Sequence, residues 1–220
     1  MRGLFITGTD TGVGKTVVSA AVLHRYRGAA RLRYWKPVQT GVEQDDDTAE
    51  VRRLAAASDD EIWTPGVRLP TPVSPHLAAQ RAGMEITLEG VRNFLPDSAE
   101  AIRWIVEGAG GVLVPLNSRD LMIDLMHALS LPVLVVVRST LGTINHTLLT
   151  LEALRTRSLC VAGVVMAGGK NESNRAAIEH YGRVPVIGVM PPLDPLDALS
   201  LGEWSRAELD PQGRLSEFFE

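Results

Sequence analysis

The sequence has almost no cysteine and no excess of positive charge. Cys160 is the single cysteine among 220 residues, so an internal disulfide is excluded. Its neighbours Leu159 and Val161 are apolar, which predicts that Cys160 is a buried, small apolar residue. The formal net charge of −4 argues against a protein that binds nucleic acid through bulk charge.

The sequence also lacks an apolar run long enough to cross a bilayer. The longest strongly apolar stretch, residues 131–137, contains a proline and falls far short of the ~20 residues that a membrane helix needs. The chain enters its first predicted strand directly, so we expect no signal peptide. These absences predict a soluble cytoplasmic protein with no membrane or nucleic-acid partner.

The composition, with 45% hydrophobic and 22% charged residues, is that of an ordinary globular protein. We expect residues 1–220 to form one domain, because this length supports one sizeable core. Helical patterns lie between most of the apolar, strand-like runs. These runs are residues 4–7, 32–35, 101–106, 133–137, 160–165 and 184–189. Several are apolar throughout, which predicts strands buried on both faces and a doubly wound α/β fold, mostly parallel, with helices on both faces of the sheet.

Three further segments carry local predictions. Residues 143–156 form a helical pattern in which Ile144, Leu148, Leu151 and Arg155 share one face. Residues 58–75 are rich in proline and turn residues and are expected to form a loop with little regular structure. The tail after residue 201 is polar and weakly patterned, and it carries no assignment.

The most informative stretch is Gly-Thr-Asp-Thr-Gly-Val-Gly-Lys-Thr at residues 8–16, between an apolar run and a helical pattern. Strand, glycine-rich turn, Gly-Lys-Thr and helix form the layout of a phosphate-binding loop. Backbone N–H groups and the helix dipole would bind an anion there. Lys15 would reach the terminal phosphates, and Thr16 would offer its hydroxyl to Mg²⁺. The common pattern has glycine where Thr9 stands, so this loop is one residue longer.

In a doubly wound sheet, ligands bind beyond the carboxyl ends of the strands. Lys36 stands where the second predicted strand ends, and it is either a second anion contact or a solvated surface lysine. Pro37 and Gly41 favour an ordered loop and hence the anion contact. The residue triplet 45–47, Asp-Asp-Asp, is either an acidic helix start or the source of one metal-binding carboxylate. The pattern alone does not say which of the three carboxylates that is.

Glu107 follows the predicted strand 101–106 and precedes a run of glycines, the place where phosphate-loop proteins carry a second metal-side acid. Gly142 and Thr143 stand at a helix start, where free N–H groups can bind a carboxylate or phosphate. His146 falls inside that helix and is expected to be structural. The sequence shows no Ser-His-Asp or Cys-His set and no metal-binding cysteine cluster.

Taken together, five stretches resemble the dethiobiotin synthetase family, and they run in family order over about three quarters of the chain. They are Gly-Thr-Asp-Thr-Gly-Val-Gly-Lys-Thr at 8–16, Lys-Pro-Val-Gln-Thr-Gly at 36–41, Ser-Pro-His at 74–76, Val-Glu-Gly-Ala-Gly-Gly at 106–111 and Leu-Gly-Thr-Ile-Asn-His at 141–146. The long variant loop combined with Glu-Gly-Ala-Gly-Gly is specific, although neither stretch alone is decisive.

The resemblance implies a reaction and its participants. 7,8-Diaminopelargonate takes up CO₂ on one amine as a carbamate, and the γ-phosphate of ATP is transferred to it. The second amine then closes a cyclic urea, which releases dethiobiotin, ADP and phosphate. Mg²⁺ and ATP are the implied cofactor and co-substrate. A homodimer with the active site at its interface is also implied.

The resemblance assigns roles residue by residue. The catalytic positions are Lys15 (phosphates), Lys36 (carbamate and γ-phosphate) and Thr11. The nucleotide-binding positions are Gly12, Val13, Gly14, Lys15, Thr16, Val17 and Pro191. The substrate-binding positions are Thr11, Lys36, Thr40, Gly110, Gly142, Thr143 and Asn145, with Gly142–Asn145 receiving the substrate's tail carboxylate from the neighbouring subunit. The metal positions are Thr16, Asp47 and Glu107. Asp47 matches because the family's acid stands just before a small-residue helical stretch.

Two departures and three rival functions bear on this assignment. In many members of the family an asparagine contacts the adenine base, and Ala167 stands at that position here. This implies a base held by backbone contacts. Residues 188–191 match the family only loosely.

Partitioning or septum-positioning ATPases carry a second lysine where this chain has Asp10. Amidating enzymes of cobalamin synthesis add a glutamine-hydrolysing domain, for which 220 residues leave no room. An inactive relative would not be expected to keep Lys15, Thr16, Lys36 and Glu107 together.

Overall fold

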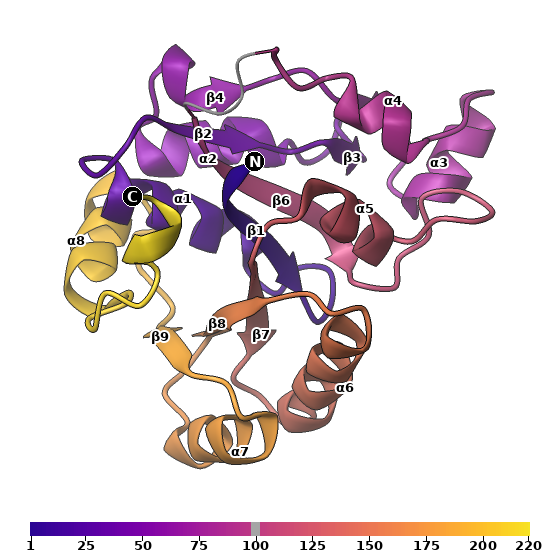
Figure 1. Cartoon of the computed structure of the whole chain (residues 1–220). Coiled ribbons are helices and arrows are strands. Elements are labelled where there is room, and N and C mark those ends of the chain that lie inside the picture. The colour runs from indigo at the N-terminus through magenta and orange to yellow at the C-terminus, as the bar shows by residue number, and fades with distance from the viewer. Residues whose placement is uncertain (98–101) are drawn as a thin grey trace.

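The computed structural model, which describes residues 1–97 and 102–220, is built around a seven-stranded parallel sheet in the order β4-β2-β6-β1-β7-β8-β9 (Figure 1). The strands are β1 (Arg2–Gly8), β2 (Leu32–Trp35), β4 (Ile62–Trp63), β6 (Arg103–Gly111), β7 (Val133–Arg138), β8 (Val161–Ala167) and β9 (Val186–Met190). Successive residues of the central strands contribute to opposite cores: Val133 and Val135 pack in one apolar cluster, Leu134 and Val136 in the other. This two-sided burial explains why the strands are apolar throughout.

Helices cover both faces of the sheet. The helix bounds are α1 (Lys15–Tyr26), α2 (Asp47–Ala55), α3 (Pro75–Arg81), α4 (Leu88–Arg92), α5 (Met122–Leu129), α6 (Thr143–Thr156), α7 (Glu172–Gly182) and α8 (Ala198–Glu208). Helices α1, α2 and α8 share one apolar cluster with the sheet, and α3 to α7 share the other. The predicted doubly wound α/β fold is confirmed. No helix in the described residues is long and apolar enough to cross a membrane.

The prediction that residues 58–75 form an irregular loop is wrong in part. The segment contains a 3₁₀ turn, η1 (Asp59–Glu61), then β4, which joins the main sheet beside β2, and then β5 (Val67–Leu69). Strand β5 pairs in parallel with β3 (Val38–Thr40) in a second, two-stranded sheet. These strands are only two or three residues long, too short for an apolar period to emerge among prolines.

Most predicted boundaries hold within a few residues. Strand β2 and helix α6 match their predicted ranges. The buried face of α6 is centred on residues such as Thr147 and Leu154, while Ile144 and Leu148 are half-buried and Arg155 is exposed. Of the predicted strand 101–106, residue 101 lies outside the described residues, and β6 continues to Gly111.

The prediction that Cys160 is buried is wrong, because its side chain is exposed. Cys160 stands just before β8 begins, and the preceding Leu159 takes the buried position, at 8% exposed. An apolar sequence context therefore did not determine which neighbour faces the core.

The C-terminal segment is anchored to the end of α1 through Asp210, which is 1% exposed. The hydroxyl of Tyr26, the last residue of α1, donates to Asp210 Oδ2 at 2.5 Å. The same carboxylate accepts the backbone N–H groups of Arg214 and Leu215, at 2.9 and 2.7 Å. Phe219 stacks on the Tyr26 ring with centroids 4.5 Å apart. One buried carboxylate thus fastens the tail to the helix that begins at the phosphate loop.

We predict that Tyr26→Phe lowers the free energy of unfolding by about 1–3 kcal/mol. The substitution keeps the stacked ring but removes a buried hydrogen bond to a carboxylate, a bond of the stronger kind. Urea denaturation measures the change. Tyr181→Phe, at a residue 68% exposed, is the matched control and should leave the midpoint unchanged. An unchanged midpoint for Tyr26→Phe would contradict the anchoring role of Asp210.

Candidate active site

A cavity of about 710 Å³ lies where the loops after β1 and β2 meet the end of β6. This is the carboxyl edge of the sheet, where ligands of doubly wound folds bind. Most of the residues that the sequence singled out line it. They are Thr11, Gly12, Gly14, Lys15, Thr16, Val17, Lys36, Thr40, Asp47, Glu107 and Gly110.

The phosphate loop has the backbone that its glycines permit. Helix α1 begins at Lys15 behind Gly14, whose φ of 100° lies in the left-handed region, and no side chain caps the helix. A Cβ at Gly8 would lie 2.5 Å from Val13 Cγ2, so the longer loop closes over Gly8 only because Gly8 has no side chain. The uncapped N–H groups of α1 are therefore available to an anion.

Lys15 lies folded inside this loop. Its Nζ donates to the backbone oxygen of Asp10 at 2.9 Å, and the residue is 7% exposed. Burial, together with the positive charge of Lys36, lowers the pKa of Lys15 to about 8. A bound phosphate group would bring a further negative charge to this buried ammonium.

The second lysine, Lys36, is the centre of a buried ion cluster. Its Nζ lies 2.6 Å from Asp47 Oδ2 and 2.8 Å from Glu107 Oε1, and it donates to the backbone oxygen of Gly108 at 3.0 Å. The Lys36 side chain is 3% exposed and that of Glu107 is 0% exposed. Lys36 is therefore not a solvated surface lysine.

Lys36 and Asp47 favour each other's ionised state. Burial by itself would lower the pKa of Lys36, but the carboxylates of Glu107 and Asp47 outweigh burial and raise this pKa above its ordinary value. Burial would likewise raise the pKa of Asp47, but the charge and hydrogen bond of Lys36 and the Thr16 hydroxyl lower it overall. The site thus keeps a fixed arrangement of paired charges out of bulk water.

Thr16 brings a hydroxyl to the same two carboxylates. Its Oγ1 lies 2.7 Å from Asp47 Oδ1 and 3.1 Å from Glu107 Oε1. Three oxygen donors from α1, α2 and β6 therefore converge, and this hard donor set fits Mg²⁺, which takes few protein ligands and completes its shell with water and phosphate oxygens. Within residues 1–97 and 102–220, no group of three or more His, Cys, Asp or Glu side chains could hold a metal, and the donors here are two carboxylates and one hydroxyl.

The structure separates the three consecutive aspartates. Asp46 is the N-cap of α2, and its Oδ1 accepts the N–H groups of Thr48 and Ala49 at 2.9 and 3.2 Å. Asp47, the first residue of the helix, faces Thr16 and Lys36, while Asp45 is exposed. Asp46 therefore fits the interpretation as an acidic helix start, and Asp47 is the carboxylate of the three that reaches Thr16.

Some predicted positions lie outside the cavity. Val13 is buried against Gly8. Pro191 follows β9, and Ala167 and Met190, at the ends of β8 and β9, lie closest to where a Cβ on Gly14 would stand. The three residues Gly142, Thr143 and Asn145 are at the start of α6 and are not among the lining residues of the cavity.

Sequence reasoning missed several residues that hold the site. The Tyr34 hydroxyl donates to Glu107 Oε2 at 3.0 Å, and Ser19 Oγ lies 2.9 Å from the same oxygen. Arg68 Nη1 donates to the backbone oxygen of Lys36 at 2.7 Å. Arg138 bridges the loop through Asp10 Oδ2 at 3.2 Å and the backbone oxygen of Thr11 at 3.1 Å. The one available signal was a residue with a hydroxyl group in an otherwise apolar strand or helix. A buried hydroxyl of this kind needs a hydrogen-bond partner, which here is the buried Glu107.

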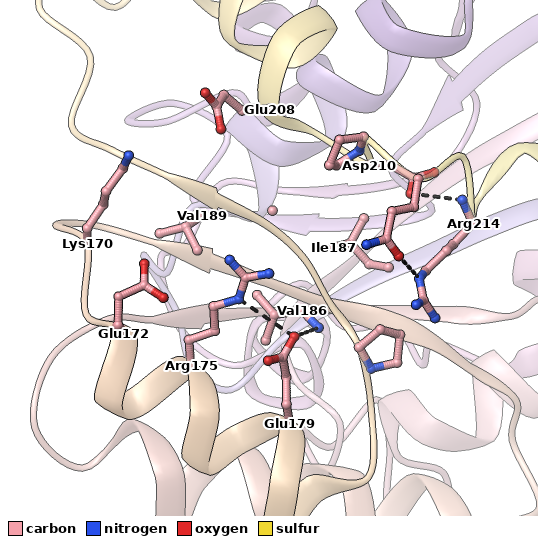
Figure 2. Close-up of a pocket in the computed structure, with 14 residues that line it drawn as sticks. Lys170, Glu172, Arg175, Glu179, Val186, Ile187, Val189, Glu208, Asp210 and Arg214 are labelled. Carbon is pink, nitrogen blue, oxygen red and sulfur yellow. Dashed lines mark hydrogen bonds and ion pairs between the residues drawn. The ribbon is translucent and has the colours of Figure 1, made fainter.

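A second, smaller cavity of about 180 Å³ opens beside the edge strand β9, between α7 and the segment after α8. Figure 2 shows charged side chains of both signs around it, including Lys170, Glu172 and Glu208. Arg175 pairs there with Glu179, at 3.6 Å. Most of the predicted site residues line the larger cavity, which is therefore the candidate active site.

Comparison with known proteins gives one matching family profile and several relatives named for biotin synthesis. Residues 2–200 match the sequence profile of a family described as an AAA domain. The ATP-dependent dethiobiotin synthetase BioD of Paramagnetospirillum magneticum is 50% identical over 201 residues, which are 91% of this chain and 93% of that protein. BioD of Brucella ovis is 49% identical over 88% of this chain and 87% of its own length. The biotin biosynthesis bifunctional protein BioCD of Bordetella avium is 47% identical over 93% of this chain, which spans only 43% of that longer relative.

Two solved structures share the fold at low sequence identity. A ParA family ATPase from Chlorobium tepidum superposes with a TM-score of 0.59 at 9% identity, over 93% of this chain and 97% of that one. A MinC:MinD cell division complex from Aquifex aeolicus gives a TM-score of 0.54 at 14% identity, over 94% of each chain. At these identities the similarity shows the α/β fold of phosphate-loop proteins and nothing further.

We predict that Asp46→Ala lowers stability without weakening nucleotide binding, whereas Asp47→Ala weakens nucleotide binding. Loss of the N-cap should lower the free energy of unfolding by ~1 kcal/mol and leave the affinity for ADP in the presence of Mg²⁺ unchanged. Loss of Asp47 should weaken that affinity at least about tenfold, because an oxygen donor beside Thr16 is removed. Denaturation and titration calorimetry measure the two effects. Equal loss of ADP affinity in both variants would undo the assignment of separate roles.

Proposed function

This chain belongs to the dethiobiotin synthetase family, and from that membership we propose that it converts 7,8-diaminopelargonate, CO₂ and ATP into dethiobiotin, ADP and phosphate. The observation that carries the proposal is the convergence of Lys15, Lys36 and the oxygen donors of Thr16, Asp47 and Glu107 in one cavity. This set matches what phosphoryl transfer between two anions requires, namely fixed positive charge and a metal position.

The proposed reaction has three steps. One amine of the diamine attacks CO₂ and loses a proton, which gives a carbamate. An oxygen of the carbamate attacks the γ-phosphorus of ATP; the bond between this phosphorus and the β,γ-bridging oxygen breaks, and ADP leaves. The second amine then attacks the carbonyl carbon of the carbamic–phosphoric anhydride and loses a proton. The carbon–oxygen bond to the phosphoryl group breaks, so the urea ring closes and phosphate departs.

The residues of this chain act by positioning and by charge. The N–H groups at the start of α1 and the Lys15 ammonium bind the phosphates. The Lys36 ammonium binds the carbamate and the γ-phosphoryl group, and Thr11, Thr40 and Gly110 line the space for the diamine. A bound Mg²⁺, held by Thr16, Asp47 and Glu107, would offset the negative charge of the β- and γ-phosphates. No nucleophilic side chain is needed, because the diamine supplies both nucleophiles.

Two further parts of the proposal concern the residues that bind the nucleotide base and the tail of the diamine. Ala167 and Met190 lie beside Gly14 at the ends of β8 and β9, and Pro191 follows β9, so backbone groups there would hold the base. The start of α6 does not line the cavity of its own chain, and the adjoining Leu141 is fully exposed. In a homodimer, Gly142, Thr143 and Asn145 of one subunit would bind the tail carboxylate in the other subunit's site.

We predict that purified protein with Mg-ATP and bicarbonate releases ADP rapidly only when 7,8-diaminopelargonate is added. Mass spectrometry should then detect dethiobiotin in an amount equal to the ADP. The dependence follows from the order of the steps, since the phosphoryl acceptor is the carbamate. Release of ADP at the same rate without the diamine would instead indicate an ATPase that works with another partner.

We predict that Lys15→Gln and Lys36→Gln each reduce turnover by orders of magnitude while the fold is kept, because each removes a charge that stabilises the transferring phosphoryl group. Circular dichroism and a denaturation curve check the fold. Lys170→Gln is the matched control, because Lys170 is exposed and lies at the smaller cavity. Normal turnover of Lys36→Gln would remove Lys36 from the mechanism.

A further inference from the structure

The two carboxylate oxygens of Glu107 have different neighbours. Oε1 contacts two residues that line the cavity, at 2.8 Å from Lys36 Nζ and 3.1 Å from Thr16 Oγ1. Oε2 lies close to two hydroxyl groups, those of Tyr34 at 3.0 Å and Ser19 at 2.9 Å. The carboxylate thus has one oxygen toward the reaction and one toward the protein interior.

Tyr34 and Ser19 have no access to the reaction themselves. Both are 0% exposed, and neither is among the residues that line the cavity. Tyr34 comes from β2, where it pairs in register with Ile105 of the neighbouring β6, two residues before Glu107. Ser19 comes from the first turns of α1, and its Oγ is also 2.9 Å from the backbone oxygen of Lys15. The single hydroxyl hydrogen of Ser19 is shared between two acceptors, so Tyr34 is the more constant donor to Oε2.

We propose that Tyr34 and Ser19 are positioning residues that hold Glu107 Oε2, so that Oε1 is presented to the divalent cation beside Thr16. This proposal rests on the proposed role of Glu107 as a metal ligand. Without a donor on Oε2, the carboxylate could rotate, or bind the cation through both oxygens, and the cation would shift relative to the phosphates. Partners of this kind behind a metal ligand typically change metal affinity or activity by about 10–100-fold when removed.

A plainer role would give the same contacts. A buried carboxylate needs hydrogen bonds to be stable in the core, and the two hydroxyls could serve only that need. In that case their removal would lower stability without altering how the metal and the nucleotide depend on each other. The two roles therefore differ in the coupling between Mg²⁺ and nucleotide, which can be measured without turnover.

The test is the factor by which Mg²⁺ increases the affinity for ADP, from titration calorimetry with excess Mg²⁺ and with EDTA. Tyr34→Phe removes the hydroxyl and keeps the ring in the apolar core. We expect it to reduce this factor about tenfold or more, while the affinity in EDTA changes less than about twofold. Ser19→Ala should reduce the factor less, and it carries the test by itself if Tyr34→Phe does not fold.

Two variants control for general loss of stability. Tyr26→Phe also removes a buried phenol donor to a carboxylate, but at Asp210. Ser205→Ala removes a buried serine hydroxyl that donates to the backbone oxygen of Gly202 within α8. Both should leave the Mg²⁺ factor unchanged. An unchanged factor in Tyr34→Phe and Ser19→Ala, or an equal reduction in Tyr26→Phe, would overturn the positioning role. If the unsubstituted protein shows no Mg²⁺ factor, the metal role of Glu107 fails instead.

Discussion

The interaction on which the site depends is the buried contact of the Lys36 ammonium with the carboxylates of Glu107 and Asp47, at 2.8 and 2.6 Å. A buried charge without a partner would be costly, so the three groups must be assembled together. They come from the end of β2, from β6 and from the first turn of α2. Because β2 and β6 are neighbours in the sheet, the strand order that buries the core also joins the charges.

The same cluster gives the proposed phosphoryl transfer a physical basis that needs no nucleophilic side chain. Its charges are already paired and held by neighbours, such as Tyr34 on Glu107 and Arg68 on the Lys36 backbone. Little reorganisation is then needed when two anionic substrates enter, which is the basis of electrostatic preorganisation. Family membership supplies the reaction, and the arrangement of charges supplies a physical reason why these residues suit it.

The sequence allowed the main sheet, α6, the phosphate loop and the position of Lys36 and Glu107 at the carboxyl edge of the sheet to be predicted, because long apolar runs and glycine-rich turns act locally. The acidic pattern alone could not divide roles between Asp46 and Asp47, since capping depends on where α2 begins; only the family resemblance singled out Asp47. Sequence reasoning misassigned Cys160 and overlooked β3 and β5, whose few residues carry too short a pattern. Tyr34 resembled a core residue, because its acidic partner is 73 positions away and only the sheet joins them.

The most direct test of the proposed mechanism traces the two oxygen atoms of CO₂ into the products. If the γ-phosphoryl group is transferred to a carbamate, one oxygen that entered with CO₂ leaves on the released phosphate, and the other remains in the urea carbonyl of dethiobiotin. In a reaction started with ¹⁸O-bicarbonate and stopped before its oxygens exchange with water, mass spectrometry should find equal label in phosphate and dethiobiotin. Label in dethiobiotin with unlabelled phosphate would contradict phosphoryl transfer to the carbamate, and with it the proposed function of the Lys36 cluster.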